Sequence, residues 1–146
     1  MTKILPMTEA HRETVLSMMR AFYASPAVFT NGSDEIFGAD IDACVSGSPY
    51  LEGFLFETDG IPAGYSMIAK SFATEYGCPC IWIEDIYLKP EYRNMGIASM
   101  FFDYLETRFP GHLFRLEVED DNLHAIHTYR KNGFTEWPYK EMKRGR

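Results

Sequence analysis

The sequence has 146 residues, which suits one domain with a core of its own and is too short for two. Hydrophobic residues make up 46 % and charged residues 24 %, ordinary values for a globular protein, and a net charge of −7 argues against a nucleic-acid binder. No apolar stretch reaches the roughly 18 residues that cross a bilayer, and the N-terminus turns polar early, so we expect a soluble, cytoplasmic protein with no membrane partner.

The cysteines give no sign of a disulfide framework or a metal site. There are three, and the pair in Cys78-Pro79-Cys80 lacks the two-residue spacing that is usual in zinc sites. We therefore expect no bound metal.

The first third of the chain predicts a strand, a helix and an irregular stretch. Residues 3–5 predict a short strand. Thr8 suits an N-cap, and apolar residues at helical spacing from there to about Ala24 predict an amphipathic helix. Residues 25–50 contain several Gly, Pro and Asn, which favour turns, so we expect this segment to be irregular with one short helix near 40–45.

The middle of the chain predicts three strands. Residues 51–57 and 63–71 flank the turn-forming sequence DGIP at 59–62, so they predict two antiparallel strands joined by a turn. Residues 81–88 form a longer apolar run that predicts a third strand, ended by Pro90.

The last third predicts helix, strand, helix and strand. Apolar residues from 98 to 109 recur at helical spacing, and residues 112–118 alternate as a half-buried strand does. Residues 122–132 predict a helix closed by Gly133, and a last strand or pair is expected at 134–142. This order predicts an α+β fold: a mixed, mostly antiparallel, twisted sheet flanked by helices.

A first motif, RNMGIA at residues 93–98, joins the third predicted strand to the following helix. A helix start presents free N–H groups and a positive dipole end, and small residues at Gly96 and Ala98 would let phosphate oxygens reach the amides. Arg93 adds a cation at the rim. Small residues at a helix start also serve close packing alone, and neither the Walker pattern nor the dinucleotide fingerprint is present.

A second motif lies on the helix predicted at 122–132. Asn122, Ala125 and Tyr129 fall at i, i+3 and i+7 and share one face, with a small residue between two hydrogen-bonding ones. This arrangement leaves room for a ligand arm. The alternative is that Asn122 only caps the helix and that Tyr129 is a packed surface ring.

Together, the two motifs resemble those of the GCN5-related N-acetyltransferases (GNAT family). The resemblance covers about residues 81–135, and it is carried by the segment IEDIYLKPEYRNMGIA and by Asn122, Ala125, Tyr129, Gly133 and Phe134. In that family an Arg/Gln-x-x-Gly-x-Gly/Ala loop holds the pyrophosphate of acetyl-CoA. The motif is closest to the branch that acetylates polyamines and other small amines.

The resemblance implies a GNAT fold, one N-acetyltransferase domain over residues 1–146, acetyl-CoA as cosubstrate and no metal. It further implies that the main-chain groups of Ile86 and Leu88 pair with the pantetheine arm as an added strand would, and that a bulge in their strand opens a slot for the thioester. Met95 departs from the family, where Lys or Arg is common. The full set implied to bind acetyl-CoA is Ile86, Leu88, Arg93, Asn94, Met95, Gly96, Ile97, Ala98, Ser99, Asn122, Ala125 and Tyr129.

Two catalytic residues also follow from the resemblance. An amine of pKa about 10 is protonated at neutral pH and needs a base before it can attack a carbonyl. Glu84 resembles the family's base, acting directly or through a water, although a structural or cation-binding role is the alternative. The amide of Ile86 would stabilise the oxyanion, and Tyr129 matches the acid that protonates the departing thiolate.

The acceptor is less well defined. Glu84 and Asp85 are expected to place one carboxylate on each face of their strand, and acidic and aromatic residues elsewhere could hold a polyamine or other small basic amine. A solvated acidic surface, a protein or peptide amine, an amino acid or antibiotic, and a noncatalytic acyl-CoA-binding regulator remain alternatives. Many relatives pair as homodimers, which nothing in the sequence settles. The residues expected to bind the acceptor are Glu84, Asp85, Glu117 and Tyr23.

Overall fold

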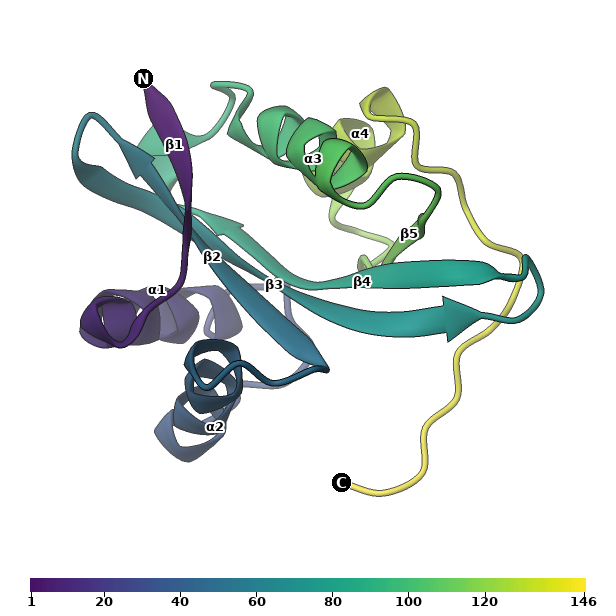
Figure 1. The fold of residues 1–146 in the computed structure, drawn as a ribbon, viewed down its shortest axis with the longest axis horizontal. Coiled ribbons are helices and arrows are strands. Elements are labelled where there is room, and N and C mark those ends of the chain that lie inside the picture. Colours follow the sequence, from purple (N-terminus) through teal and green to yellow (C-terminus); the bar gives the residue numbers. More distant parts are fainter.

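A five-stranded sheet runs through the computed structural model, which describes all 146 residues, with two helices on each face (Figure 1). The strands lie in chain order from β1 to β5; neighbours are antiparallel except β4 and β5, which are parallel. The predicted α+β class with a mixed, mostly antiparallel sheet is confirmed. The strands are β1 (Thr2–Pro6), β2 (Leu51–Thr58), β3 (Ile61–Ala73), β4 (Cys78–Leu88) and β5 (Leu113–Leu116).

Helices α1 and α2 cover one face of the sheet, and α3 and α4 cover the other (Figure 1). Each face therefore has its own apolar core, one built on Val15 and Met19 of α1 and the other on Phe101 and Leu105 of α3. None of the helices has the length and apolar character of a membrane span. The helices are α1 (Arg12–Tyr23), α2 (Asp34–Val45), α3 (Ile97–Arg108) and α4 (Leu123–Lys131), with short 3-10 turns at Glu9–His11 and Pro90–Tyr92.

The helix in the segment expected to be irregular is longer than predicted. It begins at Asp34, after Ser33, whose hydroxyl accepts a hydrogen bond from the amide of Ile36 at 3.2 Å. Only Phe37 and Ile41 are buried along it, so its apolar pattern is too sparse to reveal the first two turns.

The strand or strand pair expected at residues 134–142 is absent, and that prediction was wrong. The segment instead runs as an extended tail past the end of the β3–β4 hairpin (Figure 1). Aromatic contacts hold it there: the ring of Trp137 lies 4.6 Å from the Arg115 guanidinium, whose other neighbour is Trp82 at 4.0 Å. Phe134 and Trp137 of this segment thus pack against side chains rather than into a ladder.

Candidate active site

A β-bulge in β4 creates the opening on which the site is built. In the pairing of β3 with β4, Met67 lies opposite Asp85 and Ile68 lies opposite Ile83, so Glu84 is an extra residue. The parallel pairing of β4 with β5 ends at the same level, where Ile83 faces Leu116. Beyond this point β4 has no neighbour on that side. The bulge implied by the resemblance is therefore present, and the two strands separate at Glu84.

The free edge of β4 offers main-chain groups to a ligand. The amide of Lys89 donates to Ala63 of β3 at 2.9 Å, and on the other side Nε of Arg93 donates to the carbonyl of Leu88 at 3.0 Å. Because successive peptide groups of a strand point in opposite directions, Leu88 and Ile86 direct their groups to the free edge. An extended ligand can pair there as an added strand would.

The loop before α3 is shaped to expose amides. Asn94 and Gly96 have positive φ angles of 62° and 78°, and Gly96 is the N-cap residue. The amide of Met100 is bonded to the carbonyl of Gly96 at 3.0 Å, so the amides of residues 97–99 have no acceptor within the helix. These amides and the positive end of the helix dipole suit an anionic ligand group.

Helix α4 supplies the opposite wall. Asn122 caps it, because its Oδ1 accepts a hydrogen bond from the amide of Ala125 at 3.3 Å. Tyr129 is half buried, with ring contacts of 6.1 Å to Phe102 and 5.9 Å to Phe134. Burial raises the pKa of its hydroxyl, which makes no hydrogen bond within the chain. Tyr129 is thus protonated at neutral pH and free to donate.

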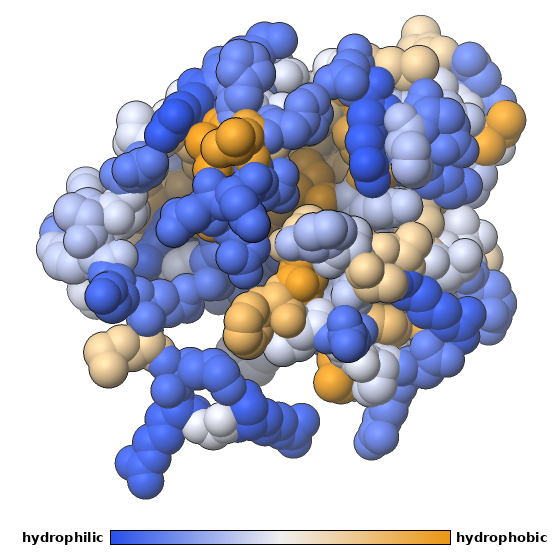
Figure 2. Space-filling model, turned by 180° about the vertical axis from the view of Figure 1, so that it is seen from behind, coloured by the Kyte–Doolittle hydropathy of each residue, from blue (hydrophilic) through white to orange (hydrophobic).

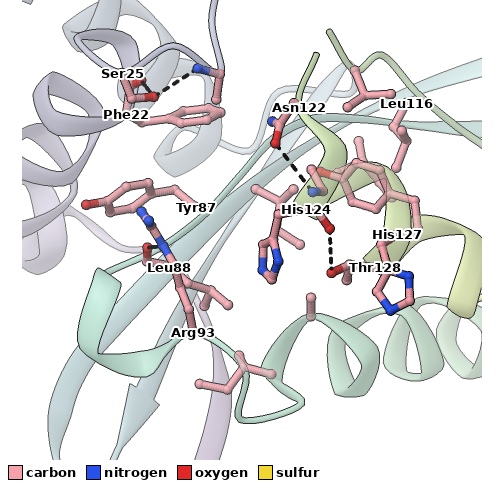
Figure 3. Close-up of a pocket in the computed structure, with 18 of the residues that line it drawn as sticks. Phe22, Ser25, Tyr87, Leu88, Arg93, Leu116, Asn122, His124, His127 and Thr128 are labelled. Carbon is pink, nitrogen blue, oxygen red and sulfur yellow. Dashed lines mark hydrogen bonds between the residues drawn. The ribbon is translucent and has the colours of Figure 1, made fainter. Parts of the chain in front are cut away.

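These elements enclose a cavity of about 670 Å³ (Figure 3). Seen from behind, the molecule is hollowed, with apolar side chains visible in the depth and hydrophilic ones around them (Figure 2). Met95 lies outside the cavity and is 63 % exposed, because the loop turns its side chain to solvent. The cavity is lined by all the other residues expected to bind acetyl-CoA and by Glu84 and Glu117.

The lining also contains residues that the motifs did not indicate. From the α1–α2 connection come Ser25, Pro26 and Ala27, which follow no periodic pattern. From α4 come His124, His127 and others, which lie on the stripe beside Asn122 and Ala125, so helical spacing could have found them. Both imidazoles project from α4 on the side that faces α3 (Figure 3).

Glu84 carries a carboxyl whose pKa is raised above its ordinary value. The largest cause is burial beside the cavity, followed by the negative charges of Asp85, Glu141 and Asp40. A carboxylate whose pKa is raised is a stronger base than a free one.

More carboxyl groups gather near Glu84. The pKa of Glu117 rises to about 7, first because it shares a hydrogen bond with Glu141 of the tail and then through burial. The pKa of Asp40 rises to about 6, through burial and the charge of Asp85. This side of the cavity therefore favours a cation. No group of three or more His, Cys, Asp or Glu is arranged to hold a metal ion.

Two residues expected to bind the acceptor do not reach the cavity. Asp85 is 5 % exposed and accepts hydrogen bonds from Tyr23 and Tyr65, on the face that α1 covers. Because Glu84 occupies the bulge, Asp85 turns into the core, and Tyr23 is turned with it. Neither side chain lines the opening, so their contact with an acceptor stays a prediction to which the cavity adds no support.

The cavity has two electrostatic ends. Of the charged lining residues, Arg93 lies by the end of β4, where it bonds to Leu88, and Lys131 comes from α4. Glu84 lies at the bulge of β4, Glu117 directly follows β5, and a third carboxyl, Asp121, precedes α4. One end thus suits an anionic ligand group and the other a cationic one, with the free edge of β4 between them.

Comparison with known proteins gives consistent results. The sequence matches the acetyltransferase (GNAT) family over residues 17–134. It is 36 % identical over 80 residues to streptothricin acetyltransferase from Streptomyces lavendulae, a match that covers 52 % of this chain and 40 % of that protein. The matched part is thus less than half of the curated relative's length.

Solved structures share the fold over nearly the whole chain. The structure of AAC(6')-Iy with the bisubstrate analog CoA-S-monomethyl-acetylneamine superposes with a TM-score of 0.79, at 17 % identity, covering 100 % of this chain and 99 % of that one. A possible acetyltransferase from Clostridium difficile 630 gives a TM-score of 0.82 at 16 % identity, covering 99 % and 97 %. At identities this low, the likeness shows a shared fold and nothing more.

Proposed function

The chain belongs to the acetyltransferase (GNAT) family, and from this premise we propose that residues 1–146 form an acetyl-CoA-dependent N-acetyltransferase acting on a primary amine of a small cationic molecule. The observation that carries the proposal is the cavity at the separation of β4 and β5, which has unpaired helix amides at one end and carboxyl groups at the other. The acetyl group would be transferred where these ends meet, beside Glu84.

Acetyl-CoA would bind along the free edge of β4. Its pyrophosphate would accept hydrogen bonds from the amides of residues 97–99, with Arg93 at the rim. Its pantetheine arm would pair with the main chain of Ile86 and Leu88 and pass the α4 face that carries Asn122 and Ala125. The positive φ of Gly96 supports this role, because it turns the loop so that the amides face the cavity.

The chain's own groups supply the chemistry of direct attack. Glu84 takes the proton of the acceptor ammonium, directly or through a water, and leaves a neutral amine. The amide of Ile86 donates a hydrogen bond to the oxygen that becomes negative as the amine nitrogen bonds to the carbonyl carbon. As the carbon–sulfur bond breaks, Tyr129 gives its proton to the thiolate, and the nitrogen, now bonded to the carbonyl carbon, gives up its second proton to water. The acetylated amine and free CoA result.

A small cationic acceptor fits the acidic end of the cavity. Glu117 and Glu141 provide a second negative region beyond Glu84, so a molecule with two or more amino groups could place one at the base and another between these carboxyls. A relative and a structural neighbour point the same way, since one is a streptothricin acetyltransferase and the other was solved with an acetylneamine-containing analog.

The test is a panel of amines assayed with acetyl-CoA by release of the CoA thiol. The panel contains streptothricin, neamine, spermidine, a lysine-containing peptide and free lysine. We expect turnover with one or more of the small polycationic compounds and a loss of at least tenfold in the Glu84→Gln variant. Turnover confined to the peptide would favour a protein N-acetyltransferase instead. Thermal stabilisation by acetyl-CoA with no turnover on any amine would favour a noncatalytic acyl-CoA-binding regulator.

We also propose that the chain forms a homodimer. The outer edge of β5 pairs with no strand, and the tail beside it carries Tyr139 and Met142, which are 64 % and 91 % exposed. Unpaired edges and exposed apolar side chains both favour burial against a second copy. Sedimentation of the intact chain tests this, and a monomer at high protein concentration would contradict it.

A further inference from the structure

Asp85 is the one charged side chain buried in the protein. Each of its carboxylate oxygens accepts a hydroxyl: Oδ1 from Tyr23 at 3.0 Å and Oδ2 from Tyr65 at 2.7 Å. It takes part in none of the chain's ion pairs. A buried carboxylate without a cation costs stability, and an apolar residue would fill this place at less cost. The arrangement therefore needs an explanation other than stability.

The main chain of Asp85 is held as firmly as its side chain. The hydroxyl of Ser66, itself fully buried on β3, donates to the Asp85 carbonyl at 2.7 Å. Asp85 directly follows Glu84, the extra residue of the bulge. In a regular strand a shift of one residue would exchange the faces of these two carboxylates. Fixing both ends of Asp85 thus keeps Glu84 directed into the cavity.

We propose that Asp85 is a positioning residue of acetyl transfer, which acts through its hydrogen bonds to Tyr23, Tyr65 and Ser66 to hold the bulge that aims Glu84 at the acceptor amine. This inference rests on the proposed role of Glu84 as the base.

The hydrogen bond from Tyr23 to Asp85 links this network to the wall of the cavity. Tyr23 is the last residue of α1, and the chain that follows it, residues 25–27, lines the cavity. Its ring also packs at 4.9 Å from Phe37 of α2. One carboxylate therefore connects the strand that carries the base to the segment facing the acceptor side.

Asp85 also acts on Glu84 through its charge, because two negative groups so close oppose each other's ionisation. The other ionisable groups that face Glu84 are Asp40 of α2, Glu117 just after β5, Glu141 of the tail and Tyr23 of α1. All of these are acidic. Replacing Asp85 by Asn removes a negative charge from this set, so the pKa of Glu84 should fall.

The experiment is a double-mutant cycle. Asp85→Asn and Tyr65→Phe are each made alone and together with Glu84→Gln, and kcat, the KM for acetyl-CoA and the pH profile of kcat/KM are measured on the acceptor found in the amine panel. We expect Asp85→Asn and Tyr65→Phe each to lower kcat about tenfold or more, while the KM for acetyl-CoA stays within about twofold of the parent value. In the Glu84→Gln background, each should lower kcat by less than about twofold. The acidic limb of the Asp85→Asn profile should move to lower pH.

Ile41→Val is the matched control, because Ile41 is fully buried in the same core and its side chain makes no hydrogen bond to the network. It should lower thermal stability and leave the pH profile in place. If Asp85→Asn does not fold, the double-mutant cycle is run with Tyr65→Phe and Tyr23→Phe, each of which removes only a hydroxyl.

Two outcomes would overturn the inference in distinguishable ways. Suppose that Glu84→Gln is impaired but Asp85→Asn lowers kcat as much in the Glu84→Gln background as it does alone, or that the acidic limb of its pH profile does not move. The positioning role is then wrong and the proposed function stands. If Glu84→Gln keeps full activity, the base itself is wrong and the positioning role falls with it.

Discussion

Arg93 donates from Nε to the main-chain carbonyl of Leu88, 3.0 Å away, and so joins the loop before α3 to the end of β4. The residue that brings positive charge to the cavity rim is thereby held at the free edge where an extended ligand would pair.

We expect Arg93→Ala to weaken acetyl-CoA binding about tenfold, through the lost charge and the loosened loop, with little change in kcat. Calorimetric titration with acetyl-CoA measures this. Arg130→Ala, on the solvent side of α4, is the control and should bind normally.

Gly96 tests the anion site through backbone conformation alone. A Cβ at Gly96 would meet no atom within 4 Å, but its φ of +78° is strained for any other residue, by roughly 1–2 kcal/mol. Gly60, in the β2–β3 turn, has the same properties, with φ +81° and open space around it. Gly96→Ala and Gly60→Ala should therefore lose similar thermal stability, but only Gly96→Ala should bind acetyl-CoA more weakly. Equal affinity in the two variants would contradict the anion site.

Tyr129 is expected to act on the departing thiolate and not on binding. Tyr129→Phe removes only the hydroxyl, so kcat should fall about 10²-fold while the dissociation constant for acetyl-CoA stays unchanged. Tyr104→Phe is the control, because Tyr104 of α3 packs against the apolar core and lies outside the cavity. Steady-state kinetics and equilibrium binding give the two quantities. An unchanged kcat for Tyr129→Phe would remove Tyr129 from the mechanism.

Glu117 should make acceptor binding depend on pH. With its pKa at about 7, its carboxyl gains charge as the pH rises through neutrality, so the KM for a cationic acceptor should fall over that range. Glu117→Gln should flatten this dependence. Glu119→Gln, two residues along and outside the cavity, should keep it.

Ionisation of the Glu117 carboxyl, which should strengthen acceptor binding, should weaken folding. The folded chain holds the proton of Glu117 more tightly than the unfolded chain does, because a Glu in an unfolded chain has a pKa of about 4.3. The contribution of this proton to stability is therefore complete at low pH and is lost as the pH rises through about 7. Thermal melts across this range should show the loss, and Glu117→Gln should reduce it.

The loop before α3 and the face of α4 could be predicted from the sequence because each depends on residues close together in the chain. Gly96 and Ala98 mark a helix start, and Asn122 and Tyr129 share a face by helical spacing alone. The location of Glu84 at the strand opening followed from the resemblance, not from any local pattern.

The parts that were missed depend on contacts between distant segments. Alternation along β4 gives no sign of the bulge, so the burial of Asp85 under Tyr23 and Tyr65 could not be read from it. The cavity wall at residues 25–27 has no pattern of its own and is held by the end of α1. The failed strand after Gly133 has the same origin, because a strand needs a partner that the segment itself does not specify.

The stacking of Arg115 between Trp82 and Trp137 has a practical consequence. These are the only two tryptophans in the chain, and both face the same guanidinium. The indole fluorescence of the unlabelled protein therefore originates where the C-terminal segment rests on the sheet, four residues before Glu141. Emission intensity and wavelength offer an optical signal for the release of that segment, which can be followed during acceptor titration without attaching a dye.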